Sequence, residues 1–181
     1  MNIAKTRRLT LTAMLAALCA VLGYVSLDLG NLKFTFESLP ILLAALLFGP
    51  LDGLAVGGMG TLIYQLLRYG VSATTVLWIA PYALCGLLAG LWARRLRFEL
   101  SRPMVLALVI ANELLITLLN TGVMYVDSKI YGYYSFVYIF GNFFLRLGIC
   151  VVKAAAFGVL LPSLLPPLRR ALSRSGAAAG K

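Results

Sequence analysis

Long apolar runs that carry almost no charge follow one another along this chain, and they constrain its fold more than any other feature. The 181 residues are 61% hydrophobic and 12% charged, with a mean hydropathy of +0.93. Soluble domains are about half apolar and a quarter charged, so a soluble core of this size could not bury so much apolar surface. A bilayer removes that need, because about 20 apolar residues in a helix cross its hydrocarbon layer. The sequence therefore predicts an all-α integral membrane protein with a single transmembrane domain, residues 1–181.

Six of these runs are predicted to be transmembrane helices, at about residues 9–26, 38–48, 51–67, 76–93, 103–124 and 136–161. Gly49-Pro50 is a strong breaker pair between the second and third helices. The sixth helix is expected to end at the prolines of residues 162–167. The intervening segments, residues 27–37, 68–75 and 125–135, are expected to be loops, and residues 174–181 are expected to be disordered.

The second run is short, which leaves an alternative in which residues 38–67 form one kinked helix and the chain crosses five times. The basic residues favour six spans. With six spans and both termini in the cytoplasm, the outer loops hold only Lys33, Arg68 and Lys129, and the other clusters face inward, as the positive-inside rule requires. The net charge of +10 is therefore interpreted as an orientation signal and not as a nucleic-acid surface.

Three charged residues stand out inside predicted helices, where charges are costly and are usually paired or functional: Glu113, Arg146 and Lys153. At about 100° per residue, two polar stripes form on the last two helices and are expected to face each other: Glu113, Thr117 and Asn120 on one, and Asn142, Arg146 and Lys153 on the other. Glu113 and Lys153 lie nearer the cytoplasmic side, where a purely structural ion pair between them is one interpretation. Asn120, Asn142 and Arg146 lie nearer the outer side, where they could line a ligand cavity.

Aromatic residues gather at the predicted outer side. One interpretation is the interfacial belt of any membrane protein, and the other is a stacking site for a flat heterocycle held by a few polar groups. The candidate substrate-binding residues are Arg146, Asn142, Asn120, Tyr64, Arg68, Trp78, Phe36 and Tyr125.

No catalytic or metal-binding pattern is visible. The chain has no histidine, and Gly57-Gly58-Met59-Gly60 lies within a predicted membrane helix and is not a phosphate loop. Cys19, Cys85 and Cys150 lie within apolar runs and are expected to be embedded in the bundle. We therefore expect a protein that is not an enzyme and binds no cofactor or metal, so that any use of ATP belongs to a partner.

The first helix carries small residues four apart, Ala13 and Ala17, with Ala16 and Ala20 beside them. Such faces let membrane helices approach closely. Taken with several other segments, this one resembles the substrate-binding S components of energy-coupling factor (ECF) vitamin transporters, and among them the folate group. Those segments are Phe36-Glu37-Ser38-Leu39-Pro40-Ile41, Leu46-Leu47-Phe48-Gly49-Pro50, Gly53 to Gly57-Gly58-Met59-Gly60, Tyr82-Ala83-Leu84-Cys85-Gly86-Leu87 and the sixth helix around Arg146.

The resemblance implies a six-helix protein of the bacterial plasma membrane that binds a vitamin at its outer face. It also implies partners, namely a coupling transmembrane subunit and two ATPase subunits, with Ala13 and Ala17 contacting the coupling subunit. Folate is the first candidate ligand. Folate binders usually carry a Pro-Thr-Gly type of loop after the third helix, but residues 68–75 read differently here. A queuosine precursor or pantothenate therefore stays an alternative ligand, and a stand-alone secondary transporter an alternative function.

Overall fold

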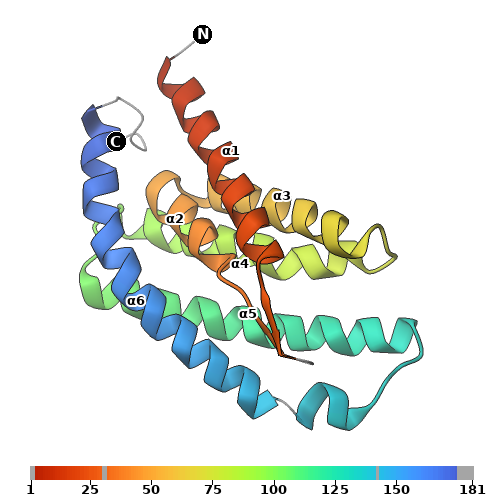
Figure 1. Cartoon of the computed structure of the whole chain (residues 1–181). Helices are drawn as coiled ribbons and strands as arrows, with labels where there is room; N and C mark the ends of the chain where they lie inside the picture. Colours follow the sequence, from red (N-terminus) through yellow and green to blue (C-terminus); the bar gives the residue numbers. More distant parts are fainter. Residues whose placement is uncertain (1–2, 30–31, 142, 175–181) are drawn as a thin grey trace.

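The computed structural model describes residues 3–29, 32–141 and 143–174, with side chains for residues 5–26, 34–141 and 143–172. Within these residues lie six α-helices, one π-helical turn and one short hairpin (Figure 1). In chain order they are α1 (Ile3–Tyr24), β1 (Leu27–Leu29), β2 (Leu32–Phe34), α2 (Ser38–Phe48), α3 (Pro50–Tyr69), α4 (Thr75–Arg95), α5 (Arg102–Ile130), η1 (Val137–Gly141) and α6 (Phe143–Arg174).

Four helical segments of the described chain are long and apolar enough to cross a membrane: Lys5–Tyr24, Thr75–Arg95, Arg102–Ile130 and Val137–Leu172. Helix α2 is apolar but has only 11 residues, which makes it about 16 Å long. Helix α3 has 20 residues but is interrupted by glycines and polar side chains. The expected set of six helices is therefore present, and the number that crosses the bilayer stays a prediction.

Helix α2 occupies the centre of the bundle, where it packs against α1, α3, α4 and α6. All of its residues except Leu39 are buried. Its apolar side chains, such as Leu42 and Leu46, belong to a core that also includes Val109 of α5 and Phe157 of α6. A helix shorter than the bilayer is stable in this position because protein, not lipid, surrounds it on every side.

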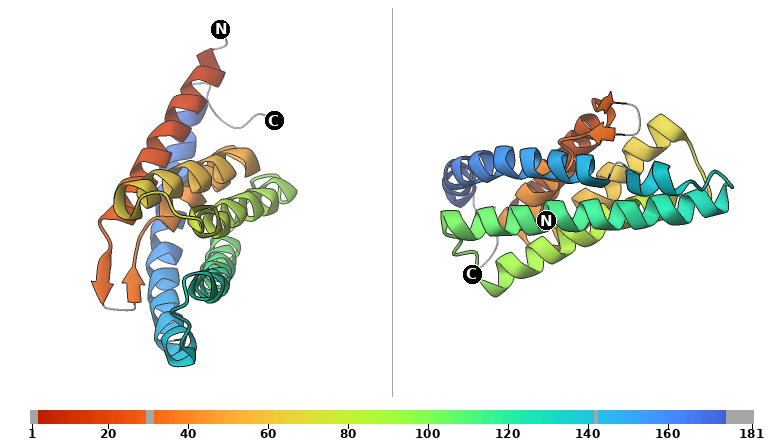
Figure 2. Two further views of the ribbon diagram at one scale, coloured as in Figure 1. Left: turned by 90° about the vertical axis from the view of Figure 1, so that its right-hand side faces the viewer. Right: turned by 90° about the horizontal axis from the view of Figure 1, so that it is seen from below.

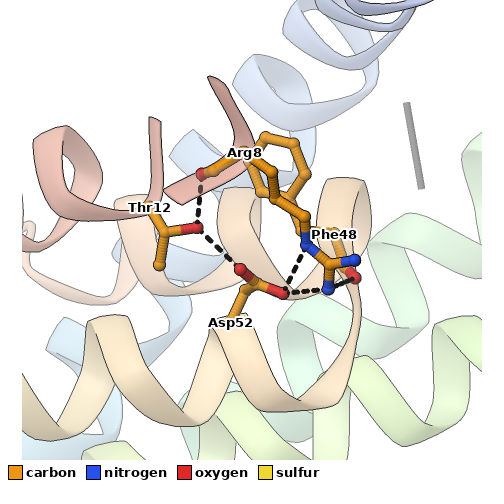
Figure 3. Close-up of polar contacts among 4 residues, drawn as sticks. All are labelled: Arg8, Thr12, Phe48 and Asp52. Carbon is orange, nitrogen blue, oxygen red and sulfur yellow. Dashed lines mark hydrogen bonds and ion pairs between the residues drawn. The ribbon is translucent and has the colours of Figure 1, made fainter. Parts of the chain in front are cut away.

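The carboxyl end of α2 is held by two arginines from distant parts of the chain. Arg8 of α1 donates to the carbonyl of Phe48 at 2.8 Å and pairs with Asp52 of α3 (Figure 3). Arg169 of α6 donates to the carbonyls of Leu46 at 3.3 Å and Phe98 at 2.7 Å. The last carbonyls of a helix have no partner within it, and a buried end needs other donors. These contacts bring together one end of the bundle, hereafter the arginine end.

The opposite end of the bundle contains the C-terminal ends of α1, α3 and α5 and the N-terminal end of α4. It is hereafter called the aromatic end. Arg68 donates to the carbonyl of Tyr24 and the hydroxyl of Ser26, each at 3.0 Å. The indole of Trp78 donates to Asp127 at 3.2 Å. Successive helices thus run between the same two ends, and the start of α1 and the close of α6 lie on one side of the molecule (Figures 1 and 2).

Helices α3 and α4 pack with their backbones in contact. A Cβ atom added to Gly53 would overlap the carbonyl oxygen of Gly86, and one added to Gly86 would overlap that of Gly53. Gly57 meets the carbonyl of Tyr82 in the same way. The glycines of α3 therefore form the surface that lets α4 approach, as small residues do in membrane helix pairs.

Several expected boundaries differ in the structure; α1 begins at Ile3 and ends at Tyr24, where a helix over residues 9–26 was expected. The segment of residues 27–37 contains an antiparallel hairpin, with Asp28 opposite Lys33, where a loop was expected. Helix α5 continues past Met124 to Ile130, because no glycine or proline follows Met124 before Gly132, whose φ is +76°. Helix α6 passes through Pro162, Pro166 and Pro167 and curves along its length (Figure 1), since proline removes backbone hydrogen bonds and can bend a helix without ending it. The disorder expected for residues 174–181 concerns a segment that, after Arg174, lies outside the described residues.

Candidate functional site: a polar cavity at the aromatic end

A cavity of about 560 Å³ lies among α3, α4, α5 and α6 and extends to the aromatic end. Side chains from the segment between β2 and α2, from helices α3 to α6, from the segment between α3 and α4, and from the segment after α5 together with η1 line it. The lining combines aromatic rings with carboxylate, amide, hydroxyl and guanidinium groups. This mixture is typical of small-molecule sites, in which rings supply area and a few polar groups fix orientation.

Four of the expected binding residues line this cavity: Tyr64, Trp78, Asn120 and Arg146. They come from four different helices, so the fold brings together residues that the sequence separates widely. Asn142, which was expected beside Arg146, lies outside the described residues. The two polar stripes expected on the last helices do face each other, because Thr117 and Asn120 of α5 line the same cavity as Arg146 and Lys153 of α6.

Three expected residues lie outside the cavity lining. Arg68 points along α3 to the end of α1, where it donates to Tyr24 and Ser26. Phe36 packs against Phe157, with ring centroids 5.9 Å apart, and so contributes to the core.

Tyr125 is the third of these residues. It lies on α5, in the part of the helix that extends beyond the expected boundary. Its ring contacts Tyr134 edge to face at 5.7 Å, and the Lys129 ammonium lies 5.8 Å from its centroid.

Several lining residues were not among the expected ones. Glu37 stands directly before α2 and is only 1% exposed. Tyr82 of α4 contacts the amide of Asn120 at 3.2 Å and lies within electrostatic range of Glu37 and Glu113. Asp127, near the end of α5, also lines the cavity. The sequence does carry a signal for Glu37, because this acidic residue lies just before a long apolar run. Residue 37 was expected only as the last residue of the loop over residues 27–37.

The inner part of the cavity contains the Glu113–Lys153 pair. Nζ of Lys153 lies 2.8 Å from Oε2 of Glu113, and the side chains are 8% and 1% exposed respectively. The other carboxylate oxygen of Glu113, Oε1, is buried without a hydrogen-bond partner among the described residues. The pair balances two charges that would be costly alone within a membrane protein. The ion pair considered from the sequence is therefore present, and it also lines the cavity.

The rim of the cavity is organised around Asp127. Its carboxylate accepts hydrogen bonds from the indole of Trp78 at 3.2 Å and from the hydroxyl of Tyr133. Desolvation, and then the hydrogen bond to Asp127, raises the pKa of the Tyr133 hydroxyl above its ordinary value, so this tyrosine acts as a neutral donor. Both ring systems are thereby fixed by one carboxylate at the mouth of the cavity.

Other polar atoms in the lining lack partners. Oε2 of Glu37, Oδ1 of Asn120 and both terminal nitrogens of Arg146 are buried without a hydrogen-bond partner in the described part of the chain. Buried polar groups are nearly always satisfied in folded proteins, and exceptions call for a specific explanation. A ligand within the cavity would provide the missing partners.

A comparison with protein families decides the class of this protein. Residues 7–168 match the model of the ECF transporter substrate-specific component family. The chain belongs to this family. The match covers all six helices, including the central helix α2 and every element that lines the cavity. A comparison with curated protein sequences finds no significant match. As a substrate-specific component, the chain is a membrane-embedded transport subunit that binds a small substrate and works with an ECF transmembrane subunit and ATPases.

Proposed function

We propose that this substrate-specific component captures a vitamin, with folate as the first candidate, in the cavity at the aromatic end. A separate ATP-hydrolysing module then drives its release into the cytoplasm of a bacterial cell. The observation that carries the proposal is the cavity itself: about 560 Å³, lined by Tyr64 and Trp78, with unpartnered polar atoms in its wall. Cavities for small organic ligands measure about 300–1,000 Å³.

The direction of capture follows from the two ends of the bundle. Positively charged segments face the cytoplasm in membrane proteins, and Arg8, Arg95 and Arg169 lie at the arginine end, where Arg95 closes α4. On this ground we propose that the arginine end faces the cytoplasm and the cavity faces outward, in a chain that crosses the membrane six times with both termini in the cytoplasm. The substrate would then enter from the outer medium, as uptake of a vitamin requires.

The docking surface for the coupling subunit is proposed on α1. Ala13 and Ala17 are exposed there, whereas Ala16 and Ala20 are buried against the bundle. The small-residue pattern therefore has two separate uses, one internal and one facing outward. An exposed pair of small residues leaves room for the close approach of another membrane helix, which supports a role for Ala13 and Ala17 in contact with the coupling subunit.

A secondary transporter is the second candidate, and one observation weighs against it. Such a carrier needs its own coupling-ion site, and Glu113 is the acid nearest the middle of a long apolar helix, α5. Its pairing with Lys153 at 2.8 Å leaves this carboxylate already balanced by a cation. This arrangement favours a subunit that obtains its energy from partner ATPases; that the chain itself binds no cofactor or metal is part of the proposal.

The test is thermal stabilisation of the purified full chain in detergent by folate, reduced folates, queuine and its precursors, pantothenate, thiamine, riboflavin and biotin. A ligand at a hundredfold excess over its dissociation constant stabilises a protein by about 2.7 kcal/mol. Stabilisation by folates alone supports the first candidate. Stabilisation by another compound would replace folate and keep the transport role, whereas gradient-driven uptake by the chain alone in liposomes would contradict the proposal.

A further inference from the structure

We infer that the arginine end carries a binding site for one anionic phospholipid. The headgroup lies against residues 94–102, hereafter the basic turn, which joins α4 to α5, and an acyl chain lies along the exposed face of α4. This site is at the opposite end of the bundle from the cavity. The inference therefore goes beyond the proposed function and does not depend on the identity of the substrate.

The face of α4 that accommodates the acyl chain is apolar and exposed. Side chains that are 45% to 59% exposed follow one another along it at helical spacing: Leu84, Leu88, Leu91 and Trp92. The other side of α4 is packed, because Gly86 and Gly90 meet the backbone of α3. One turn beyond Leu91, the same exposed face continues to Arg95.

Trp92 lies where this apolar face meets the basic turn. Tryptophan is enriched at the boundary between hydrocarbon and headgroups, and the Trp92 side chain is 59% exposed, two residues before Arg94. The surface thus changes along α4 from aliphatic to aromatic to cationic. A phospholipid has the complementary order of groups, because its acyl chain is apolar and its phosphate is anionic.

The basic turn provides cations that the protein itself does not use. It contains four arginines and one glutamate, which gives a net charge of +3. Arg94, Arg95 and Arg97 are exposed, and no hydrogen bond or ion pair joins their guanidinium groups to another described residue. These groups are therefore available to a phosphate, with which guanidinium forms charge-assisted hydrogen bonds.

The backbone of the basic turn is strained. Arg97 and Phe98 have φ of +52° and +61°, which residues with a side chain rarely adopt. Phe98 is nevertheless fixed, because its ring packs against the core, its carbonyl accepts from Arg169 at 2.7 Å and its N–H donates to Ala93 at 2.8 Å. Strain of this kind is concentrated at functional sites. Here it keeps the Arg97 side chain at the surface directly beside a packed phenylalanine.

An anionic lipid fits this surface better than the related ligands do. Basic pockets beside transmembrane helices bind phosphate-bearing headgroups, and phosphatidylglycerol supplies both the anion and the chain. Phosphatidylcholine carries a choline cation that opposes the arginines. Inorganic phosphate lacks the chain that the exposed face of α4 contacts.

The test is quenching of Trp92 fluorescence by lipids with brominated acyl chains, which quench an indole that they contact. Trp78→Phe leaves Trp92 as the one indole of the full chain. This protein is reconstituted in bilayers that contain brominated phosphatidylglycerol or brominated phosphatidylcholine in varied proportions. We expect phosphatidylglycerol to bind beside Trp92 at least about fivefold more tightly, the contribution of one arginine close to anionic lipid.

Two double variants in this background assign the preference to the basic turn. Arg94→Gln/Arg95→Gln should bring the binding of the two lipids close to equal. Lys5→Gln/Lys129→Gln removes the same charge from exposed positions elsewhere and should leave the preference unchanged.

Arg97→Gly separates recognition from folding. Glycine adopts a positive φ without strain, so this variant should raise the melting temperature in detergent. It also removes one cation of the site, so it should reduce the preference for phosphatidylglycerol. Opposite changes of stability and lipid preference cannot come from a folding defect, whereas an unchanged lipid preference in this variant and in Arg94→Gln/Arg95→Gln would overturn the inference.

Equal quenching by the two brominated lipids in the Trp78→Phe chain would also overturn it. Equal loss of preference in the two double variants would replace the site by diffuse attraction to the membrane. Displacement of brominated phosphatidylglycerol by inorganic phosphate or glycerophosphoglycerol as effectively as by unlabelled lipid would replace it by a site for a free phosphate group. None of these results changes the stabilisation by vitamins that tests the proposed function.

Discussion

The ammonium of Lys153 on α6 lies 2.8 Å from the carboxylate of Glu113 on α5, and both side chains are almost completely buried. The two residues join the last two long helices beneath the cavity. They belong to helices that the chain connects only through the segment of residues 131–142. The pair therefore provides a direct link between α5 and α6 through two side chains that are only 8% and 1% exposed.

Removing one partner of this pair should destabilise the protein. We expect Lys153→Met to lower the free energy of unfolding by about 3 kcal/mol, because it leaves the Glu113 carboxylate buried without its cation. The double variant Glu113→Gln/Lys153→Met should recover most of this loss, since neither charge remains. The measurement is the thermal unfolding of the three proteins in detergent. A double variant no more stable than Lys153→Met would show that the charges do not act as a pair.

The arginine end offers a second stability test. Arg8→Ala removes the donor to the Phe48 carbonyl and the partner of Asp52 (Figure 3). The Arg8 side chain is 39% exposed, so solvent screening limits the expected loss to about 1 kcal/mol. Lys5→Ala is the matched control, because it removes a positive charge from an exposed position on the same helix. Equal melting temperatures for the two variants would contradict a structural role for Arg8.

The contact between α3 and α4 should tolerate no additional atoms. We expect Gly86→Ala to cost about 1–3 kcal/mol, because the new methyl group would overlap the backbone of Gly53 and force the helices apart. Gly148→Ala is the control: a Cβ at that position of α6 meets nothing within 4 Å, and alanine favours helix over glycine. The two changes should therefore shift the melting temperature in opposite directions, and a stabilising Gly86→Ala would refute the close approach.

Docking on α1 can be separated from ligand binding. We expect Ala17→Trp to abolish uptake by the complete transporter reconstituted in liposomes and to leave ligand affinity of the isolated chain unchanged, because Ala17 is exposed and far from the cavity lining. The control is Leu118→Trp, at a position of α5 that is 56% exposed and outside the proposed surface. Normal uptake by Ala17→Trp, or equal loss in both variants, would remove the docking role from this face.

A helix end could be predicted from the sequence where residues that break a helix follow an apolar run. Helix α2 begins and ends where expected, at Ser38 and Phe48, because Gly49-Pro50 stops an uninterrupted apolar run. The close of α6 was not predictable in this way, since prolines bend a packed helix without ending it. The hairpin carries a weak signal, two short apolar segments around Gly30-Asn31, which the strength of the surrounding helical pattern obscures.

The candidate site was predictable where polarity conflicts with a membrane helix. Arg146 and Asn120 stand out in the sequence because charged and polar side chains are costly in a helix surrounded by lipid. Both line the cavity. Glu37 lies just before α2 and not within a predicted helix, so the cost of polar groups in membrane helices does not single it out. The position of Arg68 depends on where the end of α1 lies, which is a tertiary relationship that no local pattern contains.

Because Arg8 and Arg169 cap α2, the arginines of the arginine end fall into two groups, one exposed and one bound to the backbone. Arg94, Arg95 and Arg97 are exposed near the C-terminal end of α4, where they can meet anionic lipid headgroups. The guanidinium groups of Arg8 and Arg169 are instead occupied by backbone carbonyls. Residues that look equivalent in a count of basic residues therefore have different consequences when lost: removing the first group changes how the protein sits in its membrane, and removing the second changes whether its central helix stays in place.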